Sequence, residues 1–79
     1  MIEIGGSTIP AHSTQDFVIE VHPLSIGASV TARPGEPLDS SWSRILWTAF
    51  VSDENKVTIR LANLTSSPVT PTVRKFIAN

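Results

Sequence analysis

Six prolines and four glycines divide this 79-residue chain into short segments. No segment keeps the three-to-four spacing of apolar residues that an amphipathic helix needs for more than one turn. Most segments are instead rich in β-branched residues, and a turn signal follows roughly every 8–12 residues. This pattern predicts an all-β protein. Five or six short strands would form a small antiparallel β-sandwich, and a small β-barrel is the alternative.

The pattern predicts strands at residues 2–4, 17–22, 29–33, 44–51, 56–63 and 73–78. The clearest pair is Arg44–Val51 with Lys56–Asn63, joined by a hairpin loop in which Asn55 takes a positive φ. In Phe17–His22 and Lys56–Asn63 apolar residues alternate with polar ones, so one face of each strand lies inward. The segment Arg44–Val51 is apolar on both faces, which predicts either a central strand or a strand covered by a partner chain.

Proline marks the connections between these strands. Pro34-Gly35 predicts a type II turn with the glycine in the left-handed region. The stretch 65–72 contains two prolines and predicts an extended connection. Asn63 begins an Asn-x-Thr glycosylation sequence, but at the end of a strand we expect its side chain to bond nearby backbone instead.

The length of the chain predicts one domain, residues 1–79, that has little core of its own. A chain of this size buries only about 60% of its unfolded surface, and small domains usually compensate with disulfides, a metal or association. The chain has no cysteine, and its two histidines, His12 and His22, lie ten positions apart without cysteine partners. We therefore expect neither a disulfide nor a metal, and predict that the protein associates with other chains.

The charge pattern argues against several classes of partner. The net charge is −1 and the basic residues are scattered, so we expect no nucleic-acid partner. The longest apolar run is too short to cross a bilayer, so we expect no membrane span. Met1–Ile4 lacks the basic start of a signal peptide, which predicts a protein made in the cytoplasm.

Residues that could carry catalysis do not form a recognisable motif. No Gly-x-Ser-x-Gly elbow occurs, and His12 and His22 are expected in a loop and at a strand end. The adjacent carboxylates Asp53 and Glu54 fall in the predicted hairpin loop, where acidic residues favour turn geometry. No glycine-rich phosphate loop is present. We predict no catalytic residue, no cofactor and no small-molecule substrate.

Aromatic and terminal residues are the candidates for contact with other chains. Trp47 lies in a strand apolar on both faces and is expected in the core. Trp42 lies among serines and either folds back on its own core or anchors a contact with another subunit. Residues 1–6 either pair in their own sheet or form an arm that pairs with a neighbour. The candidate interface residues are Ile2, Ile4, Trp42, Arg44 and Arg74.

The chain resembles a small β-domain of virion structural proteins from tailed bacteriophages. The sharpest part is Val57–Thr65, with its Val-Thr-Ile-Arg-Leu-Ala-Asn-Leu-Thr sequence. Weaker parts are Trp47–Ser52, Pro71, Arg74–Phe76, Ile9–Thr14, Phe17–Val21 and Leu24–Val30. The chain departs from the pattern in Leu38–Arg44, where Asp-Ser-Ser-Trp replaces a short glycine-bearing turn.

The resemblance implies a non-enzymatic structural protein. Such domains occur as capsid decoration (cement) proteins and as modules of tail fibres and spikes, and they commonly form trimers. A free-standing chain of this length is similar to the decoration type. It would sit on the capsid exterior as a homotrimer and bind the major capsid protein at joints between its subunits. The alternative is a receptor- or carbohydrate-binding module of a tail fibre, in which Trp42 would stack on a sugar.

Overall fold

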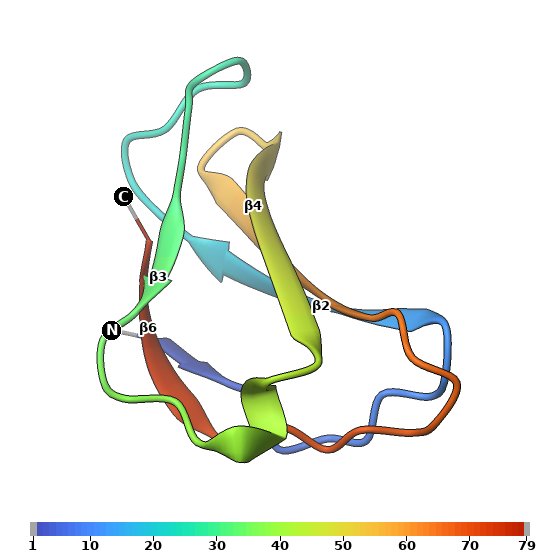
Figure 1. Ribbon diagram of the computed structural model, residues 1–79. Helices are drawn as coiled ribbons and strands as arrows, with labels where there is room; N and C mark the ends of the chain where they lie inside the picture. The colour runs from blue at the N-terminus through green and yellow to red at the C-terminus, as the bar shows by residue number, and fades with distance from the viewer. Residues whose placement is uncertain (1, 79) are drawn as a thin grey trace.

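Two three-stranded antiparallel sheets face each other in the computed structural model, which describes residues 2–78 (Figure 1). One sheet has the order β1-β6-β3 and the other the order β2-β5-β4. The elements are β1 (Ile2–Ile4), β2 (Ser13–Glu20), β3 (Ala32–Pro34), a 3₁₀ helix η1 (Ser40–Trp42), β4 (Ile45–Asp53), β5 (Lys56–Asn63) and β6 (Arg74–Ala78). This architecture confirms the predicted small all-β sandwich.

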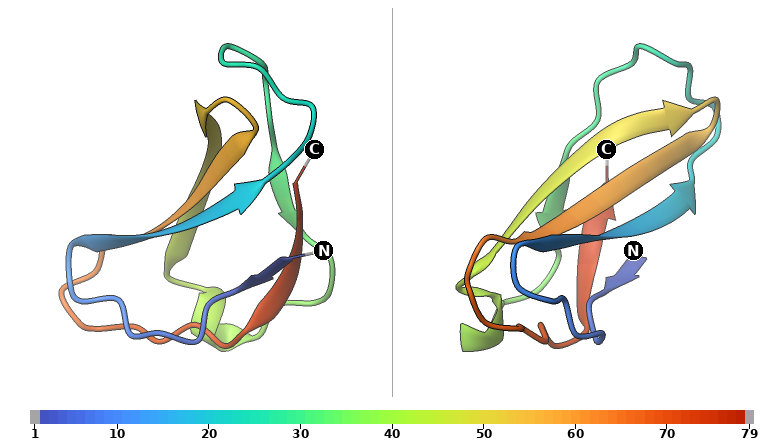
Figure 2. Two further views of the ribbon diagram at one scale, coloured as in Figure 1. Left: turned by 180° about the vertical axis from the view of Figure 1, so that it is seen from behind. Right: turned by 90° about the vertical axis from the view of Figure 1, so that its right-hand side faces the viewer.

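The larger sheet is built on the predicted hairpin. β4 and β5 pair antiparallel, and Asn55 in the loop between them has a φ of 59°. β2 pairs with the other side of β5 over its whole length, and Figure 2 shows the three strands side by side. The prediction of a central position for residues 44–51 is wrong. β5 is the central strand, and β4 lies at an edge of the sheet.

The inner face of the larger sheet supplies much of the core. Val57, Ile59 and Leu61 of β5 are fully buried, and Phe17 and Ile19 of β2 pack beside them. The alternation predicted for β2 and β5 is therefore confirmed, because a strand with one buried face repeats every two residues. β2 begins at Ser13, four residues before the predicted start, and ends two residues before the predicted end.

The smaller sheet joins segments that are far apart in the chain. β6 is its central strand, and Phe76 at its middle pairs with Ile2 of β1 and with Pro34 of β3. Residues 2–4 thus pair within their own chain, so the alternative of an arm that leaves its own sheet does not describe this structure. Phe76 is fully buried against the larger sheet.

The turn predicted at Pro34-Gly35 is wrong. Pro34 is the last residue of β3, an edge strand, where a missing N–H on the outer side costs no ladder bond. Gly35 is not at a positive φ; its N–H donates to the carbonyl of Lys75 at 2.7 Å. Hydrogen bonding to β6 thus replaces the tight turn.

Asn63 ties the end of the larger sheet to two connecting segments. The side chain is fully buried, and its Nδ2 donates to the carbonyls of Ile9, Pro10 and Ser67 at 3.0, 3.2 and 2.8 Å. Its Oδ1 accepts from the backbone N–H and the hydroxyl of Thr65. The predicted bonding of Asn63 to nearby backbone is confirmed. The connection predicted as extended for residues 65–72 bends at 65–67, and its later part has a single bridge, between Val69 and Ile9.

Candidate interaction surface

Trp42 belongs to the core. Its side chain is 3% exposed, and its indole N–H donates to the carbonyl of Thr72 at 2.9 Å. Its ring packs against Phe76 and Trp47, with centroids 5.3 and 6.1 Å away. The alternative in which Trp42 folds back on its own core is therefore the observed one. The prediction of Trp42 as an interface residue is wrong, because η1 turns the indole inward and the carbonyl of Thr72 satisfies its donor.

Arg74 holds the loop before η1 against the start of β6. Its Nη2 donates to Asp39 Oδ2 at 2.9 Å, and its Nε donates to the carbonyl of Pro37 at 3.2 Å. Asp39 also accepts from the Thr72 hydroxyl at 2.7 Å and from Ser41. The Ser41 hydroxyl, then that of Thr72, holds the pKa of Asp39 below its usual value. Arg74 serves this internal contact, so its guanidinium is not free for a partner.

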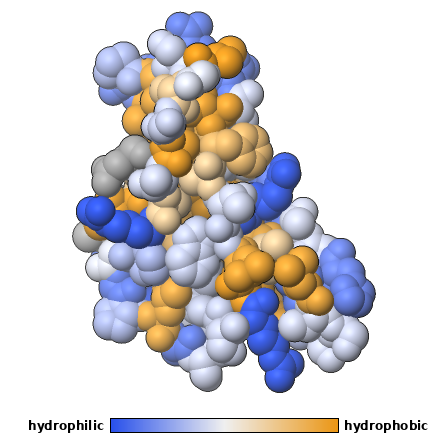
Figure 3. All heavy atoms as spheres, turned by 45° about the horizontal axis from the view of Figure 1, so that its top comes forward, coloured by the Kyte–Doolittle hydropathy of each residue, from blue (hydrophilic) through white to orange (hydrophobic). Residues whose placement is uncertain are grey.

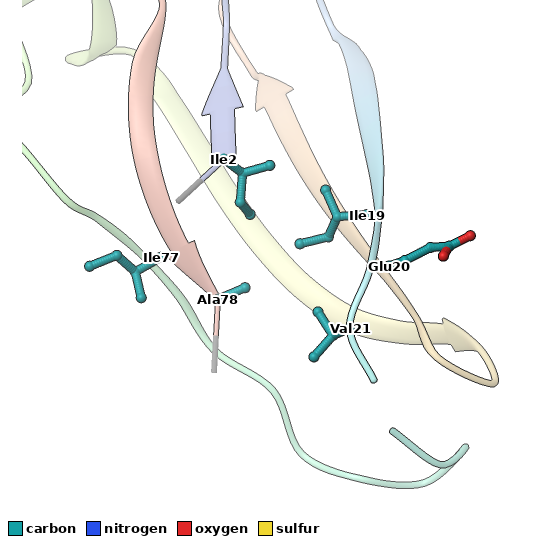
Figure 4. Close-up of a pocket in the computed structure, with 6 residues that line it drawn as sticks. All are labelled: Ile2, Ile19, Glu20, Val21, Ile77 and Ala78. Carbon is teal, nitrogen blue, oxygen red and sulfur yellow. The ribbon is translucent and has the colours of Figure 1, made fainter. Parts of the chain in front are cut away.

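The predicted contact residues of the N-terminus also lie largely inside. Ile4 is fully buried. Ile2 is half-buried and lines a groove of about 320 Å³ between the sheets. Figure 4 shows Ile2, Ile19 and Val21 pointing into this space, with Glu20 turned away at its rim. The groove is an open end of the core.

Arg44 is exposed, unlike the other predicted contact residues. It lines a shallow depression of about 350 Å³ together with Ser40, Ser43, Pro68 and Thr70. Within residues 2–78 no carboxylate forms an ion pair with it. The structure therefore does not bring the five predicted residues together into one surface.

A different surface has the properties of a contact site. It is the outer face of the larger sheet, formed by the outward side chains of β2, β5 and β4. Val18, Leu46 and Phe50 on it are 60%, 58% and 38% exposed. Three rows of the outer face, in strand register, are Thr14–Ala62–Leu46, Asp16–Arg60–Thr48 and Val18–Thr58–Phe50, and the charged pair Glu20–Lys56 lies beyond the last of them. In these three rows, the exposed apolar side chains Leu46, Phe50 and Val18 lie on the two sides of the middle row, which has charged and hydroxyl groups.

The charges on the outer face neutralise each other. Arg60 Nε and Nη2 donate to Asp16 Oδ1 and Oδ2 at 2.8 and 2.9 Å. This contact holds the pKa of Asp16 below its usual value and raises that of Arg60. The guanidinium also lies 5.2 Å from the centroid of the Phe50 ring. Because both partners are exposed, the ion pair adds little stability; its effect is to leave an outer face with no excess charge in its middle row.

The sequence shows that this surface has apolar residues, but it does not show that they face solvent. The apolar outward positions Leu46 and Phe50 are visible in the double-faced pattern of residues 44–51. The sequence does not indicate that β4 lies at an edge of the sheet with one face toward solvent. Figure 3 shows that, on the side it displays, apolar residues lie in separate groups bordered by polar ones.

Residues 2–78 contain no cluster of three or more His, Cys, Asp or Glu side chains placed to hold a metal ion. No helix in that part of the chain is long and apolar enough to cross a membrane. The amide of Asn63 is buried and fully engaged, so the Asn-Leu-Thr sequence is not open to glycosylation in the folded chain. His12 is exposed in a loop and His22 pairs with Glu20 at 3.3 Å.

Comparison with protein-family models, with curated proteins and with solved structures found no match to this chain.

Proposed function

We propose that this chain is a non-enzymatic virion structural protein of the capsid-decoration type, which attaches to the major capsid protein through the outer face. The observation that carries the proposal is the exposed apolar trio Val18, Leu46 and Phe50 on a paired, regular sheet. Exposed apolar side chains on a rigid element are typical of contact sites, because burying them against a partner releases water. The resemblance of Val57–Thr65 to phage β-domains supplies the class of partner.

Attachment to a repeating shell makes a modest contact sufficient. Each outer face has three large exposed apolar side chains, so a single copy would bind weakly. Copies linked to one another bind a lattice much more tightly, because the second contact is intramolecular. A net charge of −1 lets many copies lie close together with little mutual repulsion.

The tail-fibre alternative has less support. Its candidate for stacking on a sugar was Trp42, which is buried and hydrogen-bonded inside the protein. Phe50 is the aromatic that remains on the outer face, and Arg60 lies over its ring.

The test is co-sedimentation with expanded, undecorated shells of a tailed-phage major capsid protein. We expect the wild type to pellet with the shells and Val18→Glu to lose most of this binding. The matched control is Ile26→Glu, which also places a carboxylate at an exposed apolar position, 71% exposed, but in the loop between β2 and β3. Ile26→Glu should bind like the wild type.

Two outcomes would count against the proposal. If the wild type ignores the shells, the decoration function is wrong. If Val18→Glu and Ile26→Glu bind equally well, the outer face is not the contact. A glycan array run in parallel separates the alternative, since specific glycan binding without shell binding would favour a tail-fibre module.

A further inference from the structure

We propose that β4 pairs antiparallel with β4 of a second copy of this chain, so that the two larger sheets continue across a two-fold axis as one sheet. The inference does not depend on the decoration function. It rests on the free edge of β4, on the absence of charge, proline and glycine from Ile45 to Ser52, and on the self-complementary order of its side chains.

β4 presents a long unpaired backbone. It covers Ile45–Asp53, nine residues, and lies at an edge of the larger sheet. Within residues 2–78, no backbone hydrogen bond joins it to any element other than β5. A row of free N–H and C=O groups is a template for another β-strand. The occupant of this edge is therefore an extended chain rather than a small ligand or a helix.

The other edges are short or protected, and β4 is neither. β1 and β3 have three residues each, and β3 contains Pro34. β2 is about as long as β4 but carries Asp16 and Glu20 on its outward side. From Ile45 to Ser52, β4 has no charge, proline or glycine. Natural edge strands that stay unpaired usually carry such residues to prevent association.

The side chains of β4 match a second copy of themselves. A two-fold contact needs a surface that is complementary to itself. With the axis at Thr48, Leu46 lies opposite Phe50 of the second copy, Trp47 opposite Ala49, and Ile45 opposite Val51. Every pair except the central Thr48–Thr48 is apolar, and no charges of the same sign meet. Asp53, the only charged residue of β4, lies beyond the positions 45–51 that this register pairs.

This pairing accounts for the pattern that the single chain leaves unexplained. Residues 44–51 are apolar on both faces, yet β4 has one face toward solvent, with Leu46 and Phe50 exposed. In the paired form these two side chains become cross-strand neighbours on the outer face, and such apolar pairs stabilise a sheet. The two outer faces then form one continuous surface with two copies of Val18.

The test is the solution mass of the full chain by light scattering over a series of protein concentrations. We expect a dimer for the wild type and at least about a tenfold rise in the dimer dissociation constant for Thr48→Glu. In Thr48→Glu two carboxylates face each other at the axis, which is unfavourable. In the monomer the new carboxylate lies across from Arg60, so folding is not penalised.

The matched control is Thr14→Glu, the same change on the same face of the sheet but on the opposite edge strand. It should dimerise like the wild type. The proposal is overturned if the wild type stays monomeric throughout, if it forms the trimer implied by the resemblance, or if Thr48→Glu dimerises as tightly as Thr14→Glu.

A second variant tests the register. The chain has no cysteine, so Thr48→Cys carries a unique thiol. Opposed residues of an antiparallel pair have Cα atoms roughly 4.5–5.5 Å apart, within the range of a disulfide. Mild oxidation should convert Thr48→Cys into a covalent dimer much faster than Thr14→Cys. Equal rates for the two variants would overturn the register centred on Thr48.

Discussion

The two sheets of this protein are assembled in different ways. The larger sheet is based on a hairpin whose strands β4 and β5 follow each other in the chain, and its strands have eight or nine residues. The smaller sheet joins residues 2–4, 32–34 and 74–78, and its two edge strands have three residues each. One of the two pairings of the larger sheet, β4 with β5, is local, and the other, β2 with β5, joins distant segments. Both pairings of the smaller sheet join distant segments.

The difference shows how much each sheet depends on side chains. Closing a short hairpin loop costs less entropy than joining the two ends of the chain. Three-residue strands supply few backbone bonds to offset that cost. The smaller sheet is therefore held by Phe76, which contacts Trp42 and Trp47, and by the bonds of Asp39 and Arg74 around η1.

The largest expected effect comes from Phe76→Ala, which would break the contact between the sheets. Loss of a buried aromatic ring costs about 3–5 kcal/mol of unfolding free energy, a large part of the stability of a small domain. Urea unfolding followed by tryptophan fluorescence and by circular dichroism measures it. Val73→Ala, at a position 45% exposed, should change stability by about 0.5 kcal/mol or less.

For Phe76→Ala we expect tryptophan fluorescence and circular dichroism to change at the same urea concentration, because the inner face of the larger sheet also loses its cover. If circular dichroism retained a folded hairpin after the fluorescence change, the larger sheet would be stable alone.

Asn63→Ala should have the next largest effect on the free energy of unfolding, since this amide connects the end of β5 to the segments that lead into the smaller sheet. It would remove the amide donor shared by the carbonyls of Ile9, Pro10 and Ser67, and it would leave the backbone N–H of Thr65 without its acceptor. We expect a loss on the order of 3 kcal/mol in urea unfolding. The neighbouring control Leu64→Ala, at a position 63% exposed, should lose about 0.5 kcal/mol or less. A loss for Asn63→Ala as small as that of the control would show that the junction is not needed.

The smallest effect is a pH dependence that distinguishes Asp39 from Asp16. The folded state lowers the pKa of both carboxyls, Asp39 mainly through the Ser41 hydroxyl and Asp16 mainly through Arg60. The stability they add is present above the unfolded value, about 3.9, and is lost as the pH falls through the lower folded pKa. The urea midpoint of the wild type should therefore fall on acidification below about pH 4.

Asp39→Asn should flatten this acid dependence more than Asp16→Asn, because Asp39 accepts hydrogen bonds from both Ser41 and Thr72 and also pairs with Arg74. Asp16 has the single partner Arg60. A profile of Asp39→Asn that overlays the wild type would contradict a role for this carboxylate in holding the smaller sheet.

The hairpin, the inward faces of β2 and β5 and the bonding of Asn63 to nearby backbone could be predicted from the sequence, because each depends on neighbours within a few residues. The bonds of Asn63 to Ile9 and Pro10 could not, because they join segments distant in the chain. The candidate site could be predicted only in part. The double-faced pattern of residues 44–51 indicated a strand covered on both sides, but an edge strand and a central strand can share that pattern. Of the predicted contact residues, Ile4 and Trp42 are buried because segments distant in the chain decide their environment: Ile4 pairs with Arg74 of β6, and Trp42 packs against Phe76.

The sequence by itself determined that this chain is all-β, since short β-branched runs between prolines and glycines exclude long helices. The choice of a sandwich over a small barrel came from the two separate sheets of the structure. The tertiary structure alone decided that β1 joins β6, that Trp42 points inward and that β4 lies at an edge with Leu46 and Phe50 exposed. The physical reason is the distance along the chain over which each effect acts. Alternation and turn chemistry act between near neighbours, whereas strand order and burial depend on contacts that close loops across the whole chain.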